Sequence, residues 1–180
     1  WMVGRSIENY YPRVEHSIGD TVLKVEHISD GGIVKDVSFE LKKGEILGFS
    51  GLAGSGRTES ARVLVGLAKK ERGKVILNGK ELNIKDYRGA MESGLAYVSE
   101  DRQGDGLVLP LSIKDNITLS SLYRTGKLGF IDRKADTETA KSYMERLRIA
   151  APDHNFEVKN LSGGNQQKVS LSKGLANDPK

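Results

Sequence analysis

A glycine-rich segment in the first third of the chain follows a short apolar run and precedes a helical pattern. The apolar run covers residues 46–49, and Gly51 and Gly56 then stand at the spacing G-x-x-x-x-G. Glycines let a backbone fold back until several N–H groups point at one anion. A helix that starts directly afterwards adds donors and the positive end of its dipole. The order of buried parallel strand, glycine loop and helix therefore predicts an α/β fold with a phosphate-binding loop.

The side chains at the end of this loop predict what it would bind. Thr58 supplies a hydroxyl suited to Mg²⁺, and Arg57 supplies a cation where the usual motif has lysine. Arginine is a planar fork and not a compact charge, so this exchange is not conservative at a tight site. We expect nucleotide to bind here, and hydrolysis at this site stays open; the alternative is a glycine-rich turn without a ligand. The expected nucleotide contacts are Gly51, Leu52, Ala53, Gly54, Ser55, Gly56, Arg57, Thr58 and Glu59.

A pair of glycines opens the last helical pattern of the chain. Residues 161–167 read LSGGNQQ, and Ser162 is predicted to cap a helix that runs from Gly163 to about Ala176. Two glycines at a helix start weaken the helix by about 1 kcal/mol each relative to alanine, so a purely structural cap has little reason to carry them. They would leave N–H groups uncovered for a phosphate, whereas the alternative is a plain serine cap. The residues assigned to this contact are Ser162, Gly163, Gly164 and Gln166.

Other segments show local patterns of strands, turns and helices. Alternating apolar residues predict strands around residues 23–25 and 37–41, and Asn78-Gly79 predicts a type I′ hairpin turn. Gly94 is expected to end a short helix that starts at Tyr87, and a strand is expected over residues 95–98. Residues 100–110 are expected to form a loop and residues 111–150 helices, with Asp132 as one cap and Pro152 as a helix breaker.

Composition excludes several classes of protein. The chain has 180 residues, 37% of them hydrophobic and 29% charged, which fits a globular domain. Its lack of cysteine excludes disulfides and thiolate metal sites, and no apolar run approaches the roughly 18 residues of a membrane span. The net charge of +4 is interpreted as ordinary surface charge, and no nucleic-acid partner is expected. The histidines show no metal-ligand spacing and receive no function: His16, His27 and His154.

Three strings together resemble a known family. They are GSGRTE at residues 54–59, YVSEDR at residues 97–102 followed by DGL at 105–107, and LSGGNQQKV at 161–169. With them, residues 21–180 resemble an ABC ATPase. The closest resemblance is to the second of two tandem domains in bacterial monosaccharide-importer ATPases of the ribose, galactose or xylose type.

The resemblance implies a fold and a domain plan. The fold is an α/β P-loop NTPase core with an N-terminal antiparallel β-subdomain and an inserted α-helical subdomain, and the C-terminal part of the core is expected to be missing. The expected divisions are an inter-domain linker (1–20), the core with the β-subdomain and phosphate loop (21–100), the Q-loop region with the helical subdomain (101–160), and the signature motif with its helix (161–180).

The resemblance also implies roles and partners. ATP and Mg²⁺ would be the cofactors, with Thr58 and Glu100 as metal contacts. Glu100 occupies the family's Q-loop position and, with Ser162, is expected to take part in catalysis. Residues 162–164 would contact the γ-phosphate of ATP held by a second nucleotide-binding domain. The helical insert would receive a membrane permease on the cytoplasmic face of the membrane, and a periplasmic or extracellular sugar-binding protein would be an indirect partner.

Departures from the family pattern leave alternatives open. Residues 29–33 hold no aromatic to stack on adenine, and the resemblance places the Walker B aspartate, the catalytic glutamate and the switch histidine after Lys180. The chain is therefore expected to be part of a longer protein and not to sustain hydrolysis alone. One hypothesis is the ATP-hydrolysing motor of a sugar importer. A second is a regulatory half that binds nucleotide and supplies Ser162 to an active partner site. A third is a P-loop kinase, or an ABC protein of DNA repair or translation.

Overall fold

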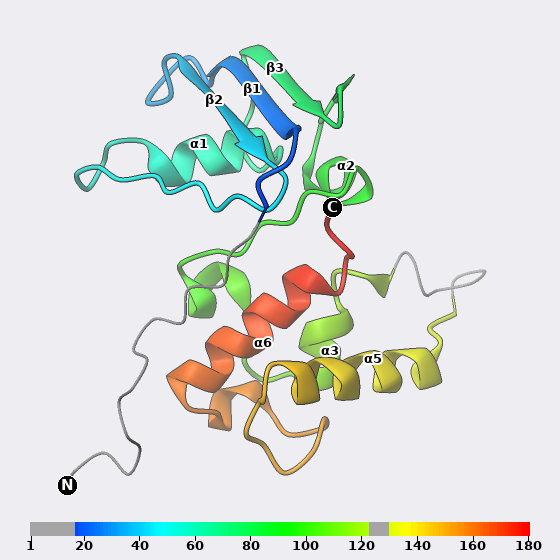
Figure 1. The fold of residues 1–180 in the computed structure, drawn as a ribbon. Coiled ribbons are helices and arrows are strands. Elements are labelled where there is room, and N and C mark those ends of the chain that lie inside the picture. Colours follow the sequence, from blue (N-terminus) through cyan, green and yellow to red (C-terminus); the bar gives the residue numbers. More distant parts are fainter. Residues whose placement is uncertain (1–16, 123–129) are drawn as a thin grey trace, which may run out of the picture.

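The computed structural model describes residues 17–122 and 130–180. The predicted linker therefore lies almost wholly outside the described residues, and so does part of the predicted helical insert. The described chain forms two lobes (Figure 1), which we call the β-lobe (residues 17–99) and the helical lobe (residues 100–122 and 130–180). The lobes are joined where residues 99–101 pass between them, and again where Lys180 N–H donates a 3.0 Å hydrogen bond to the Gly94 carbonyl.

The β-lobe is a four-stranded antiparallel sheet in the order β2-β1-β3-β4 with two helices packed beside it. Its elements are β1 (Thr21–Ser29), β2 (Val37–Lys42), α1 (Arg57–Leu64), β3 (Arg72–Leu77), β4 (Lys80–Glu81) and α2 (Tyr87–Glu92). Asn78 and Gly79 have φ angles of 50° and 75°, which confirms the predicted type I′ turn. Alternate strand residues face one core with Val63 of α1; this core comprises Leu23, Val25, Ile28, Val34, Val63, Val75 and Leu77.

The helical lobe gathers three α-helices around a second core. Its elements are η1 (Arg102–Gly106, a π-helical turn), α3 (Ile113–Thr118), α5 (Arg133–Arg146), η2 (Val158–Asn160) and α6 (Gly163–Leu175). Asp132 accepts hydrogen bonds from the N–H groups of Lys134 and Ala135, which confirms it as the cap of α5. The core residues are Leu107, Ile113, Ile117, Ala140, Ile149, Val158, Leu161 and Val169. Because α6 packs on both α3 and α5, its N-terminus is carried by this lobe.

The predicted parallel strand at residues 46–49 is wrong. The segment has no strand structure, and Ile46 is 98% exposed. A parallel strand of this kind is buried between neighbours that take up its N–H and C=O groups. The sheet of the described residues is wholly antiparallel and offers no such neighbour. Phe49 of this segment packs edge-on against the Phe39 ring, and the two ring centroids are 4.9 Å apart.

The predicted strand at residues 95–98 is also wrong. Its backbone bonds go to local partners and not to a strand: Leu95 N–H donates to the Ala90 carbonyl, and Tyr97 N–H donates to the Tyr87 hydroxyl. Gly94, with φ of 96°, ends α2 as predicted and turns the chain into this segment. Leu95, one of the apolar residues that predicted a strand, packs against the β-lobe core without forming one.

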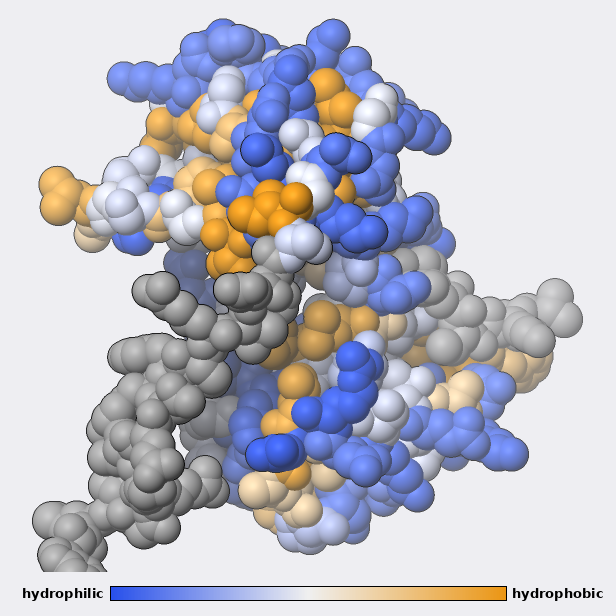
Figure 2. Space-filling model, in the orientation of Figure 1, coloured by the Kyte–Doolittle hydropathy of each residue, from blue (hydrophilic) through white to orange (hydrophobic). Residues whose placement is uncertain are grey.

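Hydrophobic side chains on the surface gather near the narrow middle of the molecule on the face drawn in Figure 2, while hydrophilic side chains dominate the outer ends. Within residues 17–122 and 130–180, no helix combines the length and apolar character needed to cross a bilayer.

Candidate functional site

The glycine loop lies open on the β-lobe and leads into α1. Gly54 and Gly56 have φ angles of 78° and 87°, in the left-handed region that glycine adopts without strain. Gly56 is the N-cap of α1, and its carbonyl accepts the first helical bond from Ser60 N–H at 2.8 Å. The N–H groups that precede Ser60 in the first turn have no intrahelical acceptor. A hollow of about 340 Å³ lies over them, lined by residues 53–59 and Glu100.

Side chains of the loop approach Gly51 closely. A Cβ at Gly51 would lie 2.7 Å from Ser55 Oγ and 3.3 Å from Ser55 Cβ, so a side chain at this position would require Ser55 to move. The same Cβ would lie 4.0 Å from Arg57 Cδ, so the Arg57 stem folds back toward the start of the loop. Arg57 is exposed and lines the hollow, so its guanidinium is available to a phosphate there.

The two residues expected to bind magnesium are brought together. Thr58 Oγ1 donates a 2.8 Å hydrogen bond to Glu100 Oε1 across the boundary between the lobes. Two neighbouring ligands of an octahedral Mg²⁺, each about 2.1 Å from the ion, would be about 3 Å apart. The spacing of these two oxygens therefore fits a shared metal ion without a large rearrangement.

The second predicted phosphate contact is an exposed helix end. Ser162 occupies the N-cap of α6 as predicted, but its hydroxyl makes no capping bond. Instead Ser162 Oγ accepts a 3.2 Å hydrogen bond from Asn165 Nδ2. Gly163 and Gly164 are exposed, and a Cβ at Gly164 would meet no atom within 4 Å. The backbone at this helix start is thus open to a ligand.

The capping pattern separates two helices from the rest. Asp86, Ser112 and Asp132 cap α2, α3 and α5 with side-chain hydrogen bonds. Among the α-helices of the described residues, α1 and α6 alone have no side-chain cap. These are the helices that follow the two glycine motifs. Their first N–H groups remain free to bind an anion, which is how proteins hold phosphate at helix ends.

Gln166, which was expected to contact nucleotide, lies in the interior. It is 5% exposed, and its Nε2 donates to the Val158 carbonyl at 3.1 Å. Its Oε1 accepts from Arg102 Nε at 3.4 Å. This placement makes Gln166 a link between η2 and η1, distinct from the exposed residues at the start of α6.

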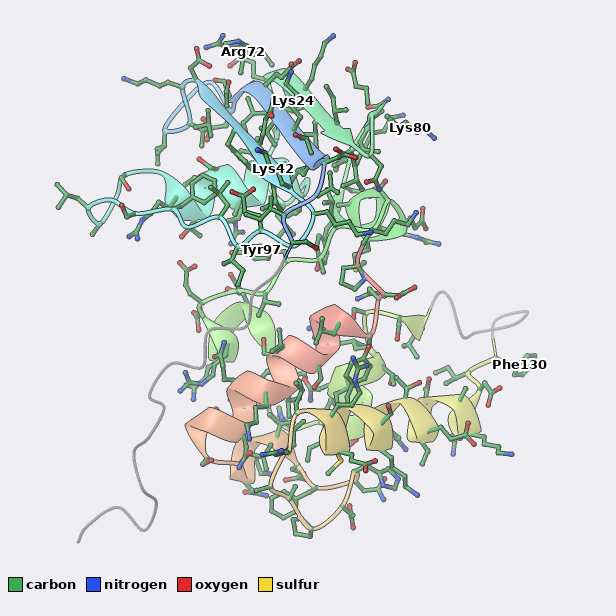
Figure 3. All side chains as sticks on the ribbon, in the orientation of Figure 1. Lys24, Lys42, Arg72, Lys80, Tyr97 and Phe130 are labelled. Carbon is green, nitrogen blue, oxygen red and sulfur yellow. The ribbon has the colours of Figure 1, made fainter. Side chains whose placement is uncertain are left out.

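The segment after Glu100 is attached to both lobes by contacts that the sequence did not reveal. Arg62 of α1 pairs with Asp105 of η1 at 3.2 Å, and Lys173 Nζ of α6 donates to the Gly106 carbonyl at 3.0 Å. Burial lowers the pKa of Lys173. Figure 3 places Tyr97 at this junction, whereas the labelled cations Lys24, Arg72 and Lys80 lie on the outer part of the β-lobe.

Ile33 is a further neighbour of the loop that sequence reasoning missed. Its Cγ2 lies 3.2 Å from the place a Cβ on Gly56 would take, and the side chain is 60% exposed. An exposed aliphatic side chain beside a phosphate loop offers an apolar surface to a bound ligand. In the sequence, Ile33 is marked only by its place after Gly31-Gly32, in the segment where the family pattern has an aromatic residue.

No group of three or more potential metal ligands occurs among His, Asp and Glu of residues 17–122 and 130–180. His27, to which no function was assigned, makes a 2.8 Å contact with Asp36.

Comparison with known proteins decides the family. The family model described as ABC transporter matches residues 34–180, which include both glycine motifs. This chain belongs to the ABC transporter family. The resemblance drawn from residues 54–59, 97–107 and 161–169 is thereby confirmed, as is the ABC ATPase fold class.

Relatives of this ABC protein carry names that refer to sugar import. A protein of Rhizobium etli, named putative ribose/galactose/methyl galactoside import ATP-binding protein 1, is 45% identical over 179 residues, or 99% of this chain and 34% of its own length. The ribose import ATP-binding protein RbsA of Oceanobacillus iheyensis is 42% identical over 99% of this chain and 36% of its own length. The chain thus spans about a third of the length of these curated relatives.

Solved structures agree on the fold. A nucleotide-free ATP-binding cassette from an ABC transporter superposes with a TM-score of 0.72 at 21% identity, covering 89% of this chain and 66% of that one. A dimeric ATP-binding cassette in a post-hydrolysis state with ADP and phosphate gives a TM-score of 0.69 at 21% identity, with coverages of 87% and 70%. At this identity the likeness extends to the fold alone.

Proposed function

We propose that this ABC domain binds Mg²⁺·ATP at residues 51–59 within a protein that couples ATP binding and hydrolysis to sugar uptake. The observation that carries the proposal is the pair of uncapped helices, α1 and α6, each of which follows a glycine motif. Free N–H groups and the helix dipole favour phosphate at both places. The names of the relatives from Rhizobium etli and Oceanobacillus iheyensis support ribose or galactose as the class of sugar.

At the loop, each group has a distinct task in this proposal. The N–H groups at the start of α1 would hold the phosphates, and Arg57 would add a positive charge. Thr58 and Glu100 would bind the Mg²⁺ ion, which neutralises phosphate charge when it is bound. Their 2.8 Å separation supports this assignment. Ile33 would offer its exposed aliphatic side chain to the nucleotide base or sugar.

At the start of α6, the proposal places a phosphate that belongs to another site. Ser162, Gly163 and Gly164 are carried by the helical lobe, whereas the loop belongs to the β-lobe. We assign these three residues to the γ-phosphate of ATP held by a second nucleotide-binding domain. An exposed N-terminus without a side-chain cap suits such a ligand, because the donors stay free until the partner arrives.

The remaining partners follow from the proposed role in import. Permease subunits would bind the helical lobe and the segment after Glu100 at the cytoplasmic face of the membrane. The sugar-binding protein would act through the permease and not through direct contact. Contacts from that segment to α1 and α6 give the permease a route to both phosphate sites.

A pair of substitutions in the full-length importer tests the proposal. Ser162→Ala should lower ATP turnover and sugar uptake together, and Thr58→Ala should weaken Mg²⁺·ATP binding. Arg57→Ala distinguishes the regulatory alternative, because that alternative requires turnover to survive loss of Arg57 while Ser162→Ala abolishes it. Unchanged nucleotide binding in Thr58→Ala together with unchanged turnover in Ser162→Ala would refute the proposed function.

A further inference from the structure

Arg102 lies where the segment after Glu100 meets the first turn of α6. It is the first residue of η1, stands two positions after Glu100, and is partly buried. The turn of η1 lies beside α6 in Figure 1. A side chain at this place can therefore move when Glu100 moves, and it can contact the start of α6.

The guanidinium touches the start of α6 at two points. Arg102 Nη2 lies 3.1 Å from the position that a Cβ on Gly163 would occupy, so the fork rests against that backbone. Arg102 Nε donates to Gln166 Oε1 at 3.4 Å, and Gln166 is itself buried and held by the Val158 carbonyl. Arg102 therefore contacts the first turn of α6 at Gly163 and at Gln166, and the Gln166 side chain is itself fixed by its hydrogen bond to the Val158 carbonyl.

The charge of Arg102 is not neutralised by any carboxylate within ion-pair distance in residues 17–122 and 130–180. The neighbouring Asp101 uses its side chain to accept from the N–H groups of Gln103 and Gly104. A guanidinium in this state is free to contact an anion or to orient the backbone that binds one.

The rest of η1 is fixed to the same helix farther along. Lys173 Nζ holds the Gly106 carbonyl, and the N–H groups of Asp105 and Gly106 both donate to the Asp101 carbonyl at 3.0 Å. The segment is therefore tied to α6 at both of its ends. Glu100, directly before it, is bonded to Thr58 of the phosphate loop.

We propose that Arg102 is a positioning residue that transmits the state of the phosphate loop to the exposed N-terminus of α6. Thr58 and Glu100 would hold the metal ion of a bound nucleotide, and Arg102 would then move with Glu100 and reposition the backbone of Gly163. The adjustment places residues 162–164 for the phosphate held by the partner domain. The proposal rests on the proposed function, and it assigns Arg102 no contact with the nucleotide of its own site.

The test uses the full-length protein assembled with its permease. Arg102→Ala should leave nucleotide affinity at this domain unchanged within about twofold, while kcat for ATP falls roughly tenfold because the phosphate contacts are misplaced. Arg102→Lys should lose less of kcat, because it keeps the charge without the planar fork. Arg88→Ala, which removes an exposed arginine of α2 that pairs with Glu92, is the matched control and should behave as wild type.

Three results would overturn the proposal. Wild-type kcat in Arg102→Ala, with kcat lost in Ser162→Ala, would reject the positioning role and leave the proposed function standing. Wild-type kcat in both variants would reject the positioning role together with the phosphate contact assigned to residues 162–164. Parallel loss of kcat and nucleotide affinity with a lower melting temperature, and no recovery in Arg102→Lys, would identify Arg102 as a support of the fold.

Discussion

The Thr58 hydroxyl donates a 2.8 Å hydrogen bond to Glu100, although the two residues lie 42 positions apart. Thr58 belongs to the first turn of α1, and Glu100 begins the segment that leads into η1. This bond joins the glycine loop of the β-lobe to the chain that supports the start of α6. It places the two expected metal ligands within hydrogen-bond distance of each other.

Gly164→Ala should separate stability from function. A Cβ there meets no atom within 4 Å, so the fold accepts it, and alanine should stabilise α6 by up to about 1 kcal/mol. The same methyl would crowd a phosphate at the helix start, and turnover of the full-length protein should fall roughly tenfold or more. Chemical denaturation and an ATPase assay measure the two effects.

The control for this variant is Gly89→Ala in α2. Its Cβ would lie at an ordinary 3.5 Å from Asp86 Oδ1, so it should raise stability without changing turnover. Wild-type turnover in Gly164→Ala would speak against phosphate binding at α6.

Asn116→Ala should strongly destabilise the helical lobe. The side chain is fully buried; its Oδ1 accepts from Val108 N–H, and its Nδ2 donates to the carbonyls of Val108 and Ser112. Loss of the side chain leaves the Val108 N–H without its partner and removes one of the two hydrogen bonds that the Val108 and Ser112 carbonyls each accept, which should cost roughly 3 kcal/mol. Urea unfolding measures the loss, and Asn160→Ala, at an exposed position, should change stability by less than about 0.5 kcal/mol. A similar small effect in Asn116→Ala would contradict the assignment.

Lys173 should make stability depend on pH in the alkaline range. Burial lowers its pKa below the ordinary 10.5, so between the two values the unfolded chain keeps a proton that the folded protein has lost. Stability from this group therefore rises with pH in that window and is constant below it. The free energy of unfolding of wild type minus that of Lys173→Met should increase as the pH rises toward about 10. A difference that stays flat or falls would show that burial does not disfavour the charged form.

Local signals predicted the elements that form through local bonds. The period-2 pattern identified β1 and β2, Asn78-Gly79 set the hairpin, and Asp132 marked the start of α5. The glycine motifs also marked the starts of α1 and α6, the two described α-helices without a side-chain cap, because their effect on the backbone does not depend on distant partners.

Contacts between distant residues could not be predicted in the same way. Apolar runs at residues 46–49 and 95–98 are compatible with parallel strands, but strand pairing needs neighbours, and the described chain provides none. The partners of Arg62, Arg102 and Gln166 lie tens of positions away and depend on how the lobes meet. Ile33 lies beside the loop because of how the β-lobe packs, and no local pattern of residue types predicts that placement.

Calorimetric titration of the full-length protein with ATP, with and without Mg²⁺, tests the central claim most directly. Thr58→Ala should weaken Mg²⁺-dependent binding at this domain roughly tenfold while leaving metal-free binding nearly unchanged, and Thr58→Ser should restore it because the hydroxyl returns. Glu100→Ala should weaken the same metal-dependent part. Equal Mg²⁺·ATP affinities in wild type, Thr58→Ala and Glu100→Ala would contradict a nucleotide site built on this pair.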